Sequence, residues 1–146
     1  MIIIIYTAMT KKAMVIAFNA HKEKVDKSGI PYIFHPFHLA EQMETEEAVI
    51  VALLHDVVED TDWSMDDLVQ EGFSQDVISA LELLTHNKDT DYLEYVCRIK
   101  QSSNPYAIAV KLADLRHNSD TSRLDCIDED TMKRIEKYAE AISIIS

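Results

Sequence analysis

The chain has 146 residues, of which 47% are hydrophobic and 27% are charged, and its formal net charge is −12. This length and composition are typical of a globular protein that can bury a core. The negative charge argues against duplex nucleic acid and anionic membrane surfaces as partners, because binding to either needs a basic face. We therefore expect neither partner, and no feature of the sequence specifies an oligomeric state.

No stretch approaches the roughly 18 apolar residues that a membrane span requires. The apolar run at residues 2–5 is too short for a signal peptide and has no basic residues before it. The two cysteines, Cys97 and Cys126, do not form a CxxC pair, and they indicate reduced thiols rather than a disulfide framework. Together these features predict a cytoplasmic protein.

Only two glycines and three prolines interrupt the chain, which favours helices joined by short loops. In chain order, we expect helices at residues 13–21, from residue 35 onward, and at residues 46–59, 64–72, 74–84, 91–100, 104–121 and 128–146, with a loop at residues 22–33. The run at residues 2–6 has β propensity but no partner strand, so we expect a helix lead-in or an arm. The sequence thus predicts an all-α fold, a single compact domain of about seven or eight helices over residues 1–146.

Several helix starts carry recognisable signals. Pro36 follows His35 and suits the first position of a helix, where its missing N–H costs nothing. Thr45 is a typical N-cap before two glutamates, which are favourable in a first turn. Ser64 begins a capping-box pattern, and the Asn104-Pro105 pair is a strong start signal.

The most informative segment is His55-Asp56-Val57-Val58-Glu59-Asp60. If the helix from residue 46 continues through it, the four polar side chains fall in one arc and the two valines fall on the other side. A solvated last turn is the simpler interpretation, but acidic groups at a helix C-terminus oppose the helix dipole. Because imidazole and carboxylate are common metal ligands, the run favours a metal-dependent hydrolase.

A second polar stripe lies on the helix predicted at residues 104–121. Lys111, Asp114, Asn118 and Thr121 fall on one side of it, opposite an apolar face. Alone, this stripe is better explained by exposure to solvent. Together with the first run, it supplies another carboxylate ligand and several donors. A histidine ligand would complete the set, but local spacing does not choose among His21, His35, His38 and His86.

The order of His35, then His55-Asp56, then Asp114 resembles the H…HD…D pattern of the HD phosphohydrolase superfamily. The similarity extends to AH at residues 20–21, KSGIPYIFHP at 27–36, LLHDVVEDT at 53–61 and VKLAD with an asparagine at 110–118. Over residues 13–145, the chain resembles the hydrolase domain of RelA/SpoT-type enzymes and the small stand-alone alarmone hydrolases. The HDVVEDT stretch is specific, whereas a bare HD dipeptide would not be.

The resemblance implies a single HD domain that removes the 3′-pyrophosphate of (p)ppGpp, giving GDP or GTP and pyrophosphate, with one divalent metal, typically Mn²⁺. It implies that the metal ligands are His35, His55, Asp56 and Asp114. It implies that Glu59 and Asp60 form the catalytic pair, with the roles of base and acid left open. It also implies substrate contacts from Lys27, Asn118 and Thr121, to which Lys111 adds positive charge near the polyphosphate.

The chain departs from the family pattern at two positions. Asp26 stands where the long enzymes carry an arginine that lies against guanine, and a carboxylate does not stack as a guanidinium does. Arg116 is shifted by one residue, so we expect it to point away from the site. These departures keep open an HD phosphohydrolase acting on another nucleotide. A nucleotide sensor without catalysis is a further alternative, but it would not need the Glu59-Asp60 pair.

Overall fold

The computed structural model describes residues 4–122 and 124–146, and there the secondary structure is helical apart from one β-bridge between Val25 and Pro31. The predicted all-α fold is therefore confirmed. Within the described residues the helices are α1 (Ala8–His21), α2 (Phe34–Glu41), α3 (Glu46–Leu54), α4 (Val57–Asp60), α5 (Met65–Gln70), α6 (Gln75–Leu84), α7 (Tyr92–Ser102), α8 (Pro105–Asn118) and α9 (Glu129–Ile145). The predicted helix at residues 46–59 corresponds to two of these, α3 and the single turn α4.

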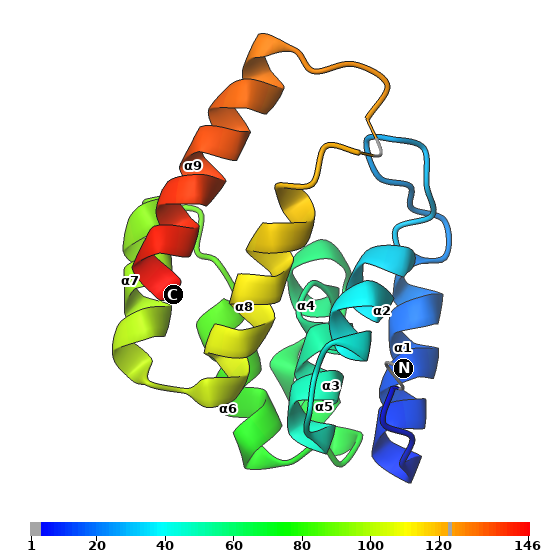
Figure 1. Ribbon diagram of the computed structural model, residues 1–146. Helices are drawn as coiled ribbons and strands as arrows, with labels where there is room; N and C mark the ends of the chain where they lie inside the picture. The colour runs from blue at the N-terminus through cyan, green and yellow to red at the C-terminus, as the bar shows by residue number, and fades with distance from the viewer. Residues whose placement is uncertain (1–3, 123) are drawn as a thin grey trace.

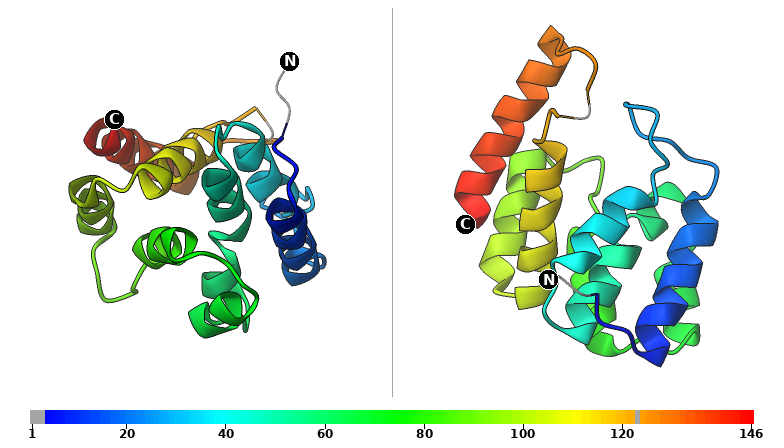
Figure 2. Two further views of the ribbon diagram at one scale, coloured as in Figure 1. Left: turned by 90° about the horizontal axis from the view of Figure 1, so that it is seen from below. Right: turned by 45° about the vertical axis from the view of Figure 1, so that its right-hand side comes forward.

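Helix α3 forms the centre of the molecule. Every side chain from residue 48 to residue 54 is buried, so the helix is apolar on all sides. It packs against α1 and α2 on one side and against α6 and α8 on the other. Figure 2 shows this arrangement end-on, with α3 between the α1–α2 pair and α8. The residues that follow α3 therefore emerge inside the bundle rather than at its surface.

Side-chain caps define most helix starts. Thr45, Ser64 and Asn104 each accept a hydrogen bond from a backbone N–H in the first turn, as the sequence predicts, and Ser74 does the same. The expectation that Pro36 takes the first position of the second helix is wrong. Helix α2 begins at Phe34, without a side-chain cap. Its proline therefore occupies the third position, which is tolerated because the first-turn N–H groups have no intrahelical partner.

Two long connections meet at one end of the bundle. Figure 1 shows the α1–α2 loop and the α8–α9 connection at the same end, while α9 runs back alongside α7 and α8. At the N-terminus, the predicted lead-in falls partly outside the described residues, which begin with the buried Ile4. None of the described helices has both the length and the apolar character needed to cross a bilayer.

We predict that Leu53→Ala destabilises the protein by about 2–5 kcal/mol, because Leu53 is 1% exposed in the central helix and its truncation leaves a cavity. Urea unfolding followed by circular dichroism measures this change. The matched control is Val15→Ala on α1, which is 61% exposed and should change the unfolding free energy by no more than about 0.5 kcal/mol. Equal effects of the two substitutions would contradict the assignment of α3 as the core.

Candidate metal centre and substrate cleft

A break in the helix positions the His-Asp motif. Helix α3 ends at Leu54 and α4 begins at Val57, so the expectation of one continuous helix through Asp60 is wrong. His55 and Asp56 keep right-handed backbone angles, with φ of −58° and −100°, but they lie outside both helices. The angular positions expected from a continuous helix therefore do not apply beyond this point.

His55 is buried with one ring nitrogen already engaged. Its Nδ1 donates to the backbone carbonyl of Ala52 at 2.7 Å, which places a proton on Nδ1, so the neutral form of the ring has its lone pair on Nε2. Nε2 lies 3.0 Å from Asp56 Oδ2 and 3.6 Å from Asp114 Oδ1, yet it makes no well-angled hydrogen bond to any described residue. A buried nitrogen lone pair between two carboxylates fits a ligand for a divalent cation.

Three of the predicted metal ligands come together. One ligand atom from each of His35, His55 and Asp114 lies within 4.8 Å of the other two, and all three residues are buried. They come from α2, from the break after α3 and from α8. Two imidazoles and a carboxylate form a donor set suited to a divalent transition metal, so the residues present fit such an ion.

Asp56, the fourth predicted ligand, borders this group but is not part of it. Its Oδ2 accepts a hydrogen bond from the Tyr32 hydroxyl and lies against His55 Nε2. Although burial opposes it, the positive charge on His55 and the hydrogen bonds lower the pKa of Asp56, so the group stays an anion. Tyr32 holds this carboxylate and was not among the residues predicted from the sequence.

Asp114 has hydrogen bonds or ion pairs at both of its carboxylate oxygens. His35 Nε2 lies 2.9 Å from Oδ1, Asn118 donates to the same oxygen at 3.1 Å, and Lys111 Nζ lies 3.0 Å from Oδ2. Burial alone would raise the pKa of Asp114, but Lys111 and the two imidazoles hold it well below its usual range. Against the effect of burial, the two carboxylates also raise the pKa of His55. The two ionised carboxylates therefore favour a positive charge beside them, on His55 or on a bound cation.

Glu59 faces a small enclosed cavity of about 100 Å³ beside the three-residue group. Its Oε1 accepts a hydrogen bond from the backbone N–H of His86, and burial raises its pKa. Lys111 lines the same cavity and is 8% exposed, with its ammonium 5.1 and 5.2 Å from the ring centroids of Tyr92 and Tyr95. Burial and the pairing with Asp114 make Lys111 an internal residue rather than part of an exposed stripe.

Asp60 borders a different and larger cavity of about 680 Å³. The predicted catalytic pair therefore lines two separate spaces, because α4 turns its successive side chains to different sides. The larger cavity, which we call the cleft, also contains three of the predicted substrate residues, Lys27, Asn118 and Thr121. Two cleft residues that the sequence analysis missed, Arg134 and Tyr138, are one turn apart on α9. Their helical spacing was visible in the sequence, but nothing local connects α9 with the loop it faces.

Asp26 has a structural function within the α1–α2 loop. Its Oδ1 accepts hydrogen bonds from the backbone N–H groups of Ser28 and Ile30, at 2.8 and 3.0 Å. The loop closes through Gly29, whose φ of +82° favours glycine. The carboxylate thereby organises the loop segment from which Lys27 lines the cleft.

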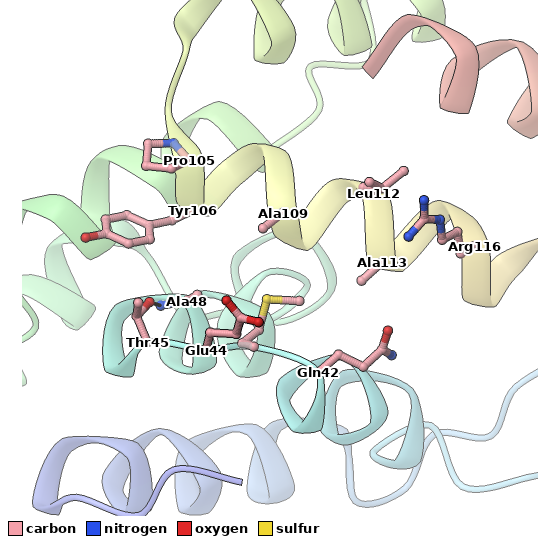
Figure 3. A pocket seen from close by; sticks show the side chains of 11 residues that line it. Gln42, Glu44, Thr45, Ala48, Pro105, Tyr106, Ala109, Leu112, Ala113 and Arg116 are labelled. Atoms are coloured by element: carbon pink, nitrogen blue, oxygen red, sulfur yellow. Dashed lines mark hydrogen bonds between the residues drawn. The ribbon is translucent and has the colours of Figure 1, made fainter. Parts of the chain in front are cut away.

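A further cavity of about 330 Å³ lies on the opposite side of α8 from the metal ligands. Figure 3 shows its lining, with Tyr106 on α8 above Thr45 and with Ala113 and Arg116 farther along α8 toward Gln42. Arg116 is exposed there and lines neither the cleft nor the small cavity. The prediction that this arginine points away from the site is confirmed.

Comparison with known proteins places these observations in a family. Residues 13–117 match the family model described as an HD domain. The chain is similar to the human guanosine-3′,5′-bis(diphosphate) 3′-pyrophosphohydrolase MESH1, with 36% identity over 134 residues that cover 84% of this chain and 73% of the human protein. It is also 32% identical, over 154 residues, to a guanosine-3′,5′-bis(diphosphate) 3′-pyrophosphohydrolase of Borreliella burgdorferi.

The bacterial relatives are much longer than the matched region. This chain spans 23% of the length of the Borreliella burgdorferi protein and 19% of a Synechocystis relative. In three dimensions, the chain is similar to a solved structure of a metazoan ortholog of SpoT that hydrolyses ppGpp. The TM-score is 0.78 at 22% identity, over 97% of this chain and 86% of that one. At this identity the structural match supports the fold.

His21, the last residue of α1, is a buried histidine beside the site. It is 1% exposed, its ring centroid lies 4.9 Å from that of Tyr32, and neither ring nitrogen has a hydrogen-bond partner among the described residues. Burial lowers the pKa of His21 from 6.5 to about 4, and the charge of Lys24 contributes. At pH values between the unfolded pKa of 6.5 and the folded pKa of about 4, the unfolded chain binds a proton at His21 that the folded protein does not. Acidification through this range therefore favours unfolding.

We predict that His21→Phe reduces this loss of stability in acid. As the pH falls from 7 to 4, the unfolding free energy of the wild type should decrease by up to about 3 kcal/mol more than that of the variant. Urea unfolding at a series of pH values measures it. The exposed His38, changed to Gln, is the control and should follow the wild-type pH dependence. Parallel curves for His21→Phe and the wild type would refute a depressed pKa.

Proposed function

This chain belongs to the HD-domain family, and from that premise we propose that it hydrolyses (p)ppGpp to GDP or GTP and pyrophosphate. The observation that carries the proposal is the three-residue group of His35, His55 and Asp114. His55 and Asp114 line the small cavity, and Asn118, which donates to Asp114, lines a nucleotide-sized cleft. The names of the curated relatives supply the substrate. Because the reaction consumes a small soluble nucleotide, we also propose that the protein acts in the cytoplasm.

The proposed metal is one Mn²⁺ ion, held by His35, His55, Asp114 and Asp56. A set of two imidazoles and two carboxylates suits a six-coordinate ion with open positions better than a closed tetrahedral zinc site. The Tyr32 hydroxyl would orient the Asp56 carboxylate, and Lys111 would orient that of Asp114. When bound, such an ion supplies a more acidic water and polarises the phosphoryl group.

Glu59 is the proposed general base. Partial burial raises its pKa, which makes the carboxylate a better proton acceptor, and its side chain lines the small cavity beside the proposed metal ligands. In the proposed reaction the water oxygen attacks the phosphorus attached to O3′, and Glu59 accepts the water proton. Lys111, in the same cavity, would offset negative charge on the phosphoryl group.

Asp60 is the proposed partner of the leaving group. The P–O3′ bond breaks and O3′ leaves with the nucleoside, which would occupy the cleft that Asp60 borders. Burial raises the pKa of Asp60, which favours a protonated fraction able to donate to O3′. The division of Glu59 and Asp60 between two cavities supports this division of roles.

The cleft has the size expected of a nucleotide site. Its volume of about 680 Å³ falls in the usual range for small-molecule pockets. Lys27 from the α1–α2 loop and Arg134 from α9 line it beside the carboxylates of Asp26, Asp60 and Asp120, and the two cations would contact the phosphates. Asn118 and Thr121 would contact the nucleoside. Helix α9 lines this cleft although it lies beyond the matched residues 13–117. We therefore propose that residues 1–146 act together as one HD domain.

One observation favours a second candidate function, hydrolysis of a different phosphorylated nucleotide. Asp26 stands where the long enzymes carry an arginine, and it accepts two hydrogen bonds from its own loop backbone, so the loop offers no guanidinium at that position to stack on guanine. The discriminating measurement is a comparison of ppGpp with other 3′-phosphorylated nucleotides under identical conditions.

We predict that the purified protein with Mn²⁺ converts ppGpp to GDP and pyrophosphate, measured by ³¹P NMR and anion-exchange chromatography. Glu59→Gln should retain the metal and lose at least about 10²-fold in rate, because it removes the base but no proposed ligand. Intact ppGpp after incubation with the metal-loaded wild type would contradict the substrate. An unchanged rate in Glu59→Gln would remove Glu59 from the role of base.

We predict that Arg134→Met raises KM for ppGpp by about 10-fold or more with little change in kcat, because it removes a cation that binds substrate and transition state alike. Steady-state kinetics over a range of ppGpp concentrations measure both constants. Arg98→Met is the matched control, since Arg98 is exposed on α7 and pairs with Glu94 outside the cleft. An equal KM in the two variants would argue against binding of the substrate beside α9.

A further inference from the structure

His117 contacts the candidate ligand His35 through a ring nitrogen. The Nδ1 atoms of the two residues lie 2.6 Å apart, within hydrogen-bonding distance. His117 follows Asp114 by three residues on α8, so the same helix contacts both nitrogens of the His35 ring. The sequence analysis did not single out His117, because its partner is 82 residues away in the chain.

The two rings meet edge to edge. Their planes differ by 18° and their centroids lie 4.9 Å apart. That separation equals the Nδ1–Nδ1 distance plus one ring radius on each side, as expected when the rings are nearly coplanar and joined at their nitrogens. Face-to-face stacking would not bring two ring nitrogens to 2.6 Å at this centroid distance. The geometry is that of an in-plane N–H···N hydrogen bond.

This hydrogen bond contains one proton, and its position determines what His35 can bind. A neutral imidazole has one protonated and one unprotonated nitrogen. If His117 Nδ1 accepts, the proton lies on His35 Nδ1 and the lone pair is on Nε2, the atom 2.9 Å from Asp114 Oδ1. His55 has the same arrangement, because its Nδ1 donates to the carbonyl of Ala52. In this tautomer both neutral imidazoles would direct an Nε2 lone pair toward the Asp114 carboxylate, an arrangement that is repulsive unless a cation lies between them.

We propose that His117 is a positioning residue that fixes the tautomer and the ring orientation of His35 for metal binding. The inference rests on the metal centre of the proposed function, and it assigns to His117 a role that the sequence pattern does not. Hydrogen-bond partners of ligating histidines affect metal affinity by about 10–100-fold in other proteins. His117 is only half-buried, and the exposed His38 ring covers it at 4.6 Å between centroids. His117 therefore connects the buried ligand with the surface.

Two substitutions separate hydrogen bonding from packing. His117→Phe keeps a ring of similar shape but has no acceptor, whereas His117→Asn loses the ring but retains an oxygen close to the Nδ1 position. If His117 positions His35, the affinity for Mn²⁺ should fall about 10–100-fold in His117→Phe and by clearly less in His117→Asn. Isothermal titration calorimetry on the folded proteins measures this. If His117 only packs, the order of the two variants is reversed and the proposal is wrong.

The control is His38→Gln, which contacts His117 but no proposed ligand, and its Mn²⁺ affinity should remain within about twofold of the wild type. A wild-type protein that binds no Mn²⁺ would overturn the metal centre and this inference with it. Tight binding by the wild type and by His117→Phe alike would overturn only the inference. The two failures are therefore distinguishable.

A second measurement needs no variant and so does not depend on how the variants fold. In the ¹⁵N-labelled wild type loaded with diamagnetic Zn²⁺, the His35 ring proton should reside on Nδ1. A scalar coupling should connect it through the hydrogen bond to His117 Nδ1. Long-range ¹H–¹⁵N and ¹⁵N–¹⁵N correlation spectra report both. A proton on His35 Nε2, or no coupling between the two Nδ1 atoms, would contradict the role of His117.

Discussion

The structure depends on keeping Asp114 ionised in the interior. A buried carboxylate is costly unless cations and donors surround it, and here a lysine, an asparagine and two imidazoles do so. These groups come from α2, from the break after α3 and from α8 itself, so the same interaction links three separate segments of the bundle. The apolar packing around α3 places these elements within reach of one another, and the charge at their centre determines what the site can bind.

The break between α3 and α4 lets neighbouring side chains of one motif line two different cavities. Because His55 and Asp56 leave the helix, Glu59 faces the enclosed space beside Lys111 and Asp60 faces the cleft. A continuous helix would have directed all four side chains to one side. The proposed division of labour, with water activation in one space and the nucleotide in the other, follows from this local interruption of the hydrogen-bond ladder.

The helices could be predicted largely from the sequence, whereas the site could be predicted only in part. Caps such as Ser64 and Asn104 act within one turn, so local spacing predicts them. The choice of His35 among the histidines came from a resemblance, because its distinguishing contact with Asp114 spans 79 residues. Tyr32, Arg134 and His117 were missed for the same reason. Each acquires its role through a partner distant in the chain, which no local pattern encodes.

The central claim is that α2, the break after α3 and α8 jointly hold one divalent ion. The most direct measurement is anomalous diffraction from crystals grown with manganese, with data collected on both sides of the manganese absorption edge. The account predicts a single anomalous peak within coordination distance of His35 Nε2, His55 Nε2 and a carboxylate oxygen of Asp114. Fully ordered side chains at these positions without an anomalous peak between them, at a saturating manganese concentration, would contradict it.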